Sequence, residues 1–134
     1  MRRSDQTILI VEHDDPTREL YLRELSRDYC VVACCDEHDV LELLRTHDIC
    51  AVVLEPGLAG GRGWSLLATI KQASDTRAVP VILCSTLDER KHGMELGANA
   101  YLIKPVLPAT LLDIIRRVAR RIEIISMPPV TNDQ

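Results

Sequence analysis

Several polar side chains of this 134-residue sequence stand directly after runs of apolar residues. They are Glu12, His13 and Asp14 after the first run, Glu55 after the third, Ser85 after the fourth and Lys104 after the fifth. Grouped carboxylates bind hard cations such as Mg²⁺, and a lysine ammonium beside a hydroxyl binds anions. Each residue alone has an ordinary explanation, such as capping of a helix by Asp14. As a set, they predict a site that holds a cation and an anion side by side.

The elements that would bring these residues together are five short runs rich in Val, Ile, Leu and Cys. Each run predicts a buried strand: Thr7 to Glu12, Tyr29 to Cys35, Ile49 to Glu55, Val79 to Ser85 and Ala100 to Lys104. Segments with helical spacing follow the strands, the fourth from about Asp88 to Leu96 and the last from about Pro108 to Ile125. This alternation predicts an α/β fold with a doubly wound, five-stranded parallel sheet, a three-layer (βα)5 sandwich. Ligands bind beyond the carboxyl ends of such strands.

The composition indicates one globular domain with an aliphatic core. Hydrophobic residues make up 46% of the chain, yet it has no Phe, one Trp and three Tyr. Few aromatic rings argue against an organic cofactor, and a net charge of −4 argues against direct binding to nucleic acid. No run approaches the roughly 18 apolar residues of a membrane span, and the polar start is unlike an export signal. We therefore expect a cytoplasmic protein without membrane contact.

Cysteine usage and the end of the chain add two expectations. The cysteines lack CxxC spacing and lie in apolar runs, which predicts buried free thiols in a reducing compartment; they are Cys30, Cys34, Cys35, Cys50 and Cys84. Residues 126–134 are polar with two prolines, which is typical of a disordered tail or the stub of a linker. The folded domain should therefore span residues 6–125.

Three segments carry a family pattern: Ile8 to Leu20, Pro80 to Thr86 and, most specifically, Gly97-Ala-Asn-Ala-Tyr-Leu-Ile-Lys-Pro105. In order and spacing they resemble the receiver domain of two-component response regulators, which has a flavodoxin-like fold. The resemblance implies a signalling module, not an enzyme, whose partner is a sensor histidine kinase or another signalling protein. The kinase passes a phosphoryl group to an aspartate after the third strand, where Mg²⁺ and a lysine neutralise the developing charge.

The resemblance also assigns positions of this chain to the family's site. It places the phosphoacceptor at Glu55, metal ligands at Glu12, His13, Asp14 and Gly57, and phosphate-binding and switch residues at Ser85, Tyr101, Lys104 and Pro105. Two positions depart from the pattern. Glutamate at position 55 puts its carboxylate roughly 1.5 Å beyond that of an aspartate, and the His13 imidazole is a poor ligand for Mg²⁺. Mg²⁺ binding should therefore be weak or absent.

These departures favour a pseudo-receiver. Our hypothesis is that Glu55 forms a permanent ion pair with Lys104, which holds the domain near one conformation and leaves signalling to contacts with other proteins. In a second version, the site has decayed and only the scaffold is used. One alternative is a competent receiver that is phosphorylated on Glu55 or a neighbouring aspartate with Mg²⁺. An alternative of another class is a small flavin-binding or enzymatic domain on the same fold.

The family usually signals through the face of the fourth helix, fifth strand and fifth helix. Candidate interface residues on that face are Arg90, Lys91, Glu95, Arg116, Arg117 and Arg120. Their mixed charge suits a homodimer joined by ion pairs, and it equally describes a solvated helix face. Trp64, after the glycine-rich loop, could pack in the core or contact a partner.

Overall fold

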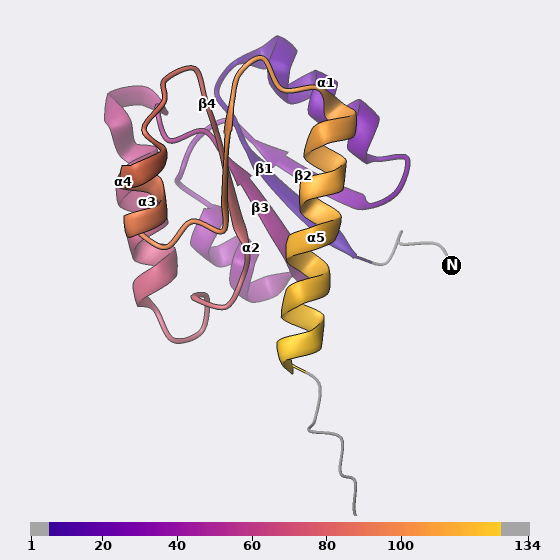
Figure 1. Ribbon diagram of the computed structural model, residues 1–134, viewed down its shortest axis with the longest axis vertical. Coiled ribbons are helices and arrows are strands. Elements are labelled where there is room, and N and C mark those ends of the chain that lie inside the picture. Colours follow the sequence, from indigo (N-terminus) through magenta and orange to yellow (C-terminus); the bar gives the residue numbers. More distant parts are fainter. Residues whose placement is uncertain (1–5, 127–134) are drawn as a thin grey trace, which may run out of the picture.

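A computed structural model describes residues 6–126 of the chain (Figure 1), apart from the side chains of Ala59 and of residues 120–126. Of the tail expected at 126–134, Ser126 is the last residue of a helix, and residues 127–134 lie outside the described residues, as does the side chain of Arg120.

The strands and helices alternate along the chain as the sequence predicts. The strands are β1 (Thr7–Val11), β2 (Cys30–Cys34), β3 (Ile49–Leu54), β4 (Val81–Ser85) and β5 (Ala100–Ile103). The helices are α1 (Asp15–Leu25), α2 (Val40–Thr46), α3 (Arg62–Gln72), α4 (Arg90–Glu95) and α5 (Pro108–Ser126), with a 3-10 turn η1 (Ala59–Gly61) before α3. Every paired strand is parallel to its neighbour, which confirms the predicted fold class.

The sheet has the strand order β2-β1-β3-β4-β5, so the winding changes direction between β1 and β3. In open parallel sheets, the crevice beyond the carboxyl ends of the strands at such a reversal is the usual ligand site. Glu12 follows β1 and Glu55 follows β3. The topology therefore brings these two carboxylates to the reversal point.

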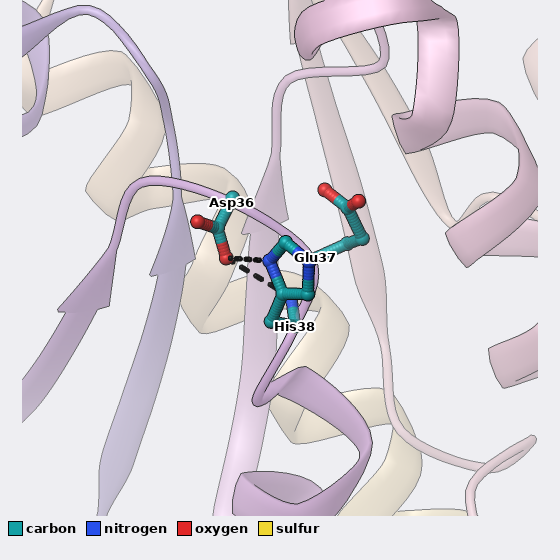
Figure 2. A group of neighbouring side chains, drawn as sticks. All are labelled: Asp36, Glu37 and His38. Carbon is teal, nitrogen blue, oxygen red and sulfur yellow. Dashed lines mark hydrogen bonds and ion pairs between the residues drawn. The ribbon is translucent and has the colours of Figure 1, made fainter.

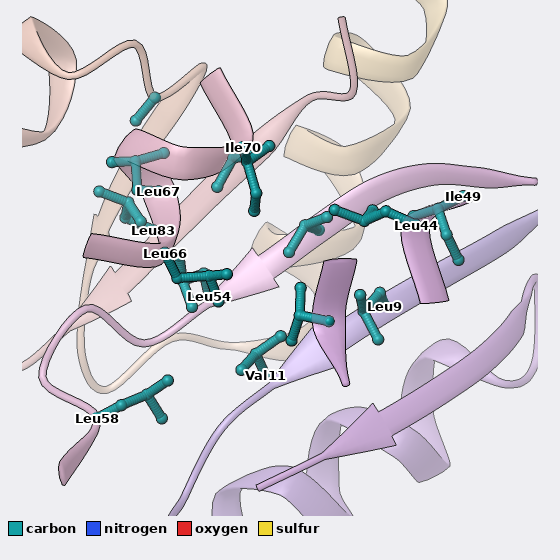
Figure 3. Close-up of a cluster of buried hydrophobic side chains, with 14 of the residues drawn as sticks. Leu9, Val11, Leu44, Ile49, Leu54, Leu58, Leu66, Leu67, Ile70 and Leu83 are labelled. Atoms are coloured by element: carbon teal, nitrogen blue, oxygen red, sulfur yellow. The ribbon is translucent and has the colours of Figure 1, made fainter. Parts of the chain in front are cut away.

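The core lies on both faces of the sheet because strand side chains alternate in direction. Leu9 and Val11 of β1 belong to the cluster that contains residues of α2 and α3, part of which Figure 3 shows. Ile8 and Ile10 belong to the cluster with residues of α1 and α5. Helices thus cover both faces, as Figure 1 shows, and the near-continuous apolar runs of the strands follow from burial on both sides.

Burial of the cysteines differs from the prediction. Among the five, which are all free thiols, only Cys84 is buried. Cys34 and Cys50 are half-buried, and Cys30 and Cys35 are exposed. Three of these residues lie on or just after β2, which is an edge strand with a neighbour on one side only. An apolar run therefore did not guarantee burial at this edge of the sheet.

A half-buried lysine near the end of α3 connects this helix to the segment before β4. Lys71 Nζ donates to the carbonyl oxygens of Arg77 at 3.1 Å and Val79 at 2.8 Å, and to Asn99 Oδ1 at 3.0 Å. Asn99 Oδ1 also accepts from Val81 N at 2.9 Å. Burial lowers the pKa of Lys71. The Asn99 amide group thus links α3 to β4.

Replacement of Asn99 by alanine should lower the free energy of unfolding by about 1 kcal/mol, because Val81 N and Lys71 Nζ both lose an acceptor. Urea unfolding measures the change, with Gln72→Ala, an exposed position on α3, as the control. Equal stability of the Asn99 variant and the control would show that water replaces the amide oxygen at no cost.

Candidate functional site

Lys104 lies between two carboxylates at the carboxyl edge of the sheet. Its Nζ donates to Glu12 Oε1 at 2.7 Å and to Glu55 Oε1 at 2.6 Å. Both glutamates are buried, and the lysine side chain is 13% exposed. The ion pair expected between Glu55 and Lys104 is therefore present, and Glu12 takes part in it as well.

Backbone contacts hold the two carboxylates in place. The register pairs Val11 with Leu54, and Glu55 N donates to Val11 O at 3.0 Å, so Glu12 and Glu55 leave the sheet side by side. Gly57 N donates to Glu55 Oε2 at 2.7 Å. Asp14 N donates to Glu12 Oε2 at 3.2 Å. Each carboxylate thus has one oxygen on Lys104 and the other on a backbone amide.

The charge of Lys104 depends on these partners. Burial alone would lower its pKa, but hydrogen bonds to Glu12 and Glu55 and the attraction of their charges outweigh burial, and the pKa is raised. Lys104 is therefore a fixed cation between two acidic groups.

The two residues after Glu12 are used differently. His13 has a side chain that is 53% exposed, with Nδ1 at 3.6 Å from Glu12 Oε2. The Asp14 carboxylate accepts from Thr17 N at 3.1 Å and from Thr17 Oγ1, and it is the N-cap of α1. These hydrogen bonds from Thr17 lower the pKa of Asp14. Asp14 thus caps a helix, which is the ordinary role that the sequence indicated for it.

A cleft of about 550 Å³ opens beside Lys104. It is lined by His13, Asp14, Thr17, Glu55, Pro56, Gly57, Trp64, Ser85, Thr86, Leu87, Glu89 and Lys104. Ser85 is buried, and its Oγ accepts from Leu87 N at 3.2 Å. The structure thus brings Glu55, Gly57, Ser85 and Lys104 to one cleft, with Glu12 beneath Lys104.

Tyr101 and Pro105 lie next to this cleft and do not line it. The Tyr101 ring is buried; its hydroxyl donates to Leu87 O at 2.6 Å and accepts from Glu89 N at 3.1 Å. Tyr101 thereby fixes the segment between β4 and α4. Pro105 follows Lys104 through a cis peptide bond and lines a smaller groove with residues of α1.

Comparison with known proteins decides the family. The sequence profile described as "Response regulator receiver domain" matches residues 8–116, which is most of the chain. The chain belongs to the response regulator receiver family. It is therefore a receiver domain of two-component signalling, as the resemblance implied.

Relatives of this receiver domain include two transcriptional regulatory proteins of Escherichia coli K12. It is 32% identical to the transcriptional regulatory protein HprR of Escherichia coli K12 over 115 residues, which cover 85% of this chain and 52% of HprR. It is 30% identical to the phosphate regulon transcriptional regulatory protein PhoB of the same strain over 131 residues, which cover 95% of this chain and 57% of PhoB. The chain thus spans about half the length of these relatives.

Solved structures show the same fold. A CheY-like receiver domain protein from Methanospirillum hungatei JF-1 aligns with a TM-score of 0.81 at 21% identity, over 90% of this chain and 98% of that chain. The chemotaxis response regulator CheY4 of Vibrio cholerae aligns with a TM-score of 0.76 at 20% identity, over 88% of this chain and 99% of that chain. These likenesses confirm the flavodoxin-like architecture.

Receiver domains typically bind Mg²⁺ in an acidic pocket, and the residues present in this receiver domain do not fit that ion. The carboxylates of Glu12 and Glu55 are both bound to Lys104. The Asp14 carboxylate caps α1, and His13 offers a nitrogen where Mg²⁺ prefers oxygen. The position between the two buried carboxylates is already held by an ammonium group.

Two features near the site escaped the sequence analysis. The Trp64 indole, half-buried, packs against the imidazole of His92 on α4, with ring centroids 4.4 Å apart. Arg18 Nη1 donates to the Glu12 carbonyl at 2.9 Å, which anchors α1 to the end of β1. Neither pairing leaves a local signal, because the partners come from different elements. Trp64 packs against the core, which was one of its two expected roles, and it also lines the cleft, while its contact with a partner stays a prediction.

A second group of metal-ligand types, Asp36, Glu37 and His38, lies in the segment after β2 (Figure 2). His38 Nδ1 lies 3.0 Å from Asp36 Oδ1, and Glu37 Oε1 accepts from Arg62 at 3.0 Å. Two of the three residues are exposed. The group is therefore a set of surface ion pairs, which contribute little to stability.

The candidate interface residues are mostly at the surface. Arg90, Lys91 and Glu95 are exposed on α4. On α5, Arg116 lies 3.7 Å from Asp28 and Arg117 lies 3.0 Å from Asp113, so both have partners within the chain. Among the described residues, no helix has the length and apolar character to cross a membrane.

Proposed function

We propose that this receiver domain acts in two-component signalling as a pseudo-receiver, through contacts with other proteins and without phosphorylation at position 55. The observation that carries the proposal is the Lys104 ammonium held between Glu12 and Glu55 at 2.7 and 2.6 Å. Phosphoryl transfer needs a free carboxylate aligned with its donor and a cation that neutralises the transferred group. Here both carboxylates and the lysine are already bound to one another.

The permanent ion pair would stand in for part of what a phosphorylated site does. It links the ends of β1, β3 and β5. The buried Tyr101 hydroxyl bonds the segment between β4 and α4. Together these contacts support a single preferred conformation, which a partner can recognise without a phosphorylation step.

A phosphorylation assay tests the proposal directly. Incubation of the wild-type chain with acetyl phosphate and Mg²⁺ should give no mass gain, because Glu55 is longer than aspartate and is bound to Lys104. The double variant Glu55→Asp with His13→Asp should gain one phosphoryl group. Intact-protein mass spectrometry is the measurement.

The Glu55→Gln variant treated in the same way is the control for labelling elsewhere. A phosphoryl group on Glu55 of the wild type would refute the pseudo-receiver and favour the competent receiver. That second candidate is supported by the cleft, where Ser85 and Lys104 lie beside Glu55.

The partner, as we propose it, is a sensor histidine kinase or another signalling protein in the cytoplasm. Docking would use the face of α4, β5 and α5, where Arg90, Lys91 and Glu95 are exposed. Four large apolar side chains on these elements or in the segments just before α4 and α5 are exposed as well: Leu87, Met94, Ile103 and Leu107. Exposed apolar side chains together with mixed charges suit a protein interface, a homodimer included. The unit that docks is the receiver at residues 6–125, which has no enzymatic step of its own.

A further inference from the structure

We infer that the cleft beside Lys104 receives the guanidinium group of an arginine presented by a partner protein. The inference rests on the proposed function, because it requires that Lys104 stays paired and no phosphoryl group enters. The cleft would then select a planar organic cation in place of an anion.

The charges around the cleft favour a cation. Its lining residues include three acidic ones, Asp14, Glu55 and Glu89, and one lysine, Lys104. Glu12, beneath the cleft, shares that lysine with Glu55. The cleft therefore carries an excess of negative charge, which repels phosphate and attracts a positive group.

Glu89 is one of the acidic residues that line the cleft. Within the described part of the chain, its side chain has no hydrogen-bond or ion-pair partner, although its backbone N donates to Tyr101 Oη at 3.1 Å. The backbone of Glu89 is thus held while its carboxylate stays available. An incoming guanidinium could form charge-assisted hydrogen bonds with it.

Trp64 supplies the flat surface that a guanidinium uses. Its indole lines the same cleft as Glu89. His92 packs against the indole with ring centroids 4.4 Å apart and planes tilted by 50°, which helps to hold the ring in place. A guanidinium stacks on an aromatic face while its edge bonds a carboxylate, whereas an ammonium group is a compact charge with stronger hydration. Indole and carboxylate in one cleft therefore favour arginine over lysine.

The size of the cleft is compatible with one side chain, since about 550 Å³ lies within the roughly 300–1,000 Å³ of small-ligand sites. A divalent metal is a poorer occupant. It would have to displace Lys104 from Glu12 and Glu55, because the Asp14 carboxylate is engaged with Thr17.

Trp64 is the only tryptophan, so its fluorescence reports the cleft in the intact chain. We expect a saturable change on titration with N-acetyl-arginine amide, at constant ionic strength. N-acetyl-citrulline amide, the neutral isostere, and inorganic phosphate should cause none. N-acetyl-lysine amide should bind more weakly. The Glu89→Gln variant should bind the arginine compound about tenfold more weakly. Glu42→Gln, which changes an exposed carboxylate on α2 that does not line the cleft, should bind it like the wild type.

Amide chemical shifts of Gly57 and Glu89 give a second readout that does not depend on fluorescence. Equal responses to the arginine and citrulline compounds, no response in either readout, or unchanged affinity in Glu89→Gln would overturn the inference. Saturable binding of phosphate or Mg²⁺ alone would also overturn it. These failures are distinguishable from failure of the proposed function, because phosphorylation of Glu55 is measured separately by mass spectrometry.

Discussion

Replacement of Lys104 by methionine is expected to lower the free energy of unfolding by about 3 kcal/mol at neutral pH. The variant keeps the apolar stem but leaves Glu12 and Glu55 facing each other without a cation. Both carboxylates are buried, so water cannot fully replace the ammonium group. Urea unfolding of wild type and variant, followed by circular dichroism, measures the difference.

The pH dependence of the free energy of unfolding separates the contribution of the Lys104 charge from that of its packing. Because the pKa of Lys104 is raised above its ordinary value of 10.5, the stability that it contributes is fully present below that value. It is lost as the pH rises through the raised pKa. The difference in stability between Lys104→Met and wild type should therefore narrow at pH values above the raised pKa of Lys104.

Lys91→Met is the matched control, because Lys91 is an exposed lysine on α4. It should change stability by less than about 0.5 kcal/mol. A Lys104 variant as stable as this control at neutral pH would mean that the bridge between the two glutamates contributes nothing. A difference that stays constant as the pH rises through the raised pKa of Lys104 would assign the loss to packing.

Replacement of Gly63 by alanine should be comparably destabilising, at about 3 kcal/mol. A Cβ at this position would lie 2.5 Å from the carbonyl oxygen of Glu55 and 2.5 Å from Cα of Pro56. Both are backbone atoms, so no side-chain rotation can relieve the overlap. Either α3 or the segment after β3 must shift, and the latter carries Glu55.

The effect of Gly63→Ala should therefore reach the site as well as the stability. We expect the amide signal of Gly57, which donates to Glu55 Oε2 at 2.7 Å, to shift in nuclear magnetic resonance spectra. Ser65→Ala, an exposed position of α3, is the control for changes within the helix. Wild-type stability together with an unmoved Gly57 signal would show that α3 accommodates the methyl group without strain.

The sequence by itself determined the architecture and most of the site. Five apolar runs separated by helical segments leave little choice beyond a parallel sheet with crossovers, since parallel strands need such connections. The residues after each run then meet at one edge, which predicts that Glu12, Glu55 and Lys104 lie together. The resemblance to the receiver family also revealed the departures from its pattern, because it assigns the phosphoacceptor to position 55 and a metal ligand to position 13, and neither residue is aspartate.

The tertiary structure decided the pairings that no local pattern encodes. Glu12 and Lys104 are separated by 92 positions, and their contact depends on strand register and on the rotamers of long side chains. The same holds for Trp64 with His92 and for Lys71 with Asn99. The exposure of Cys30 also could not be predicted from the sequence. An edge strand and a central strand can have the same apolar sequence, and they differ only in how many strands flank them. Hydrophobic periodicity specifies which face of an element is buried; which charged groups then meet is set by the packed arrangement of all the elements.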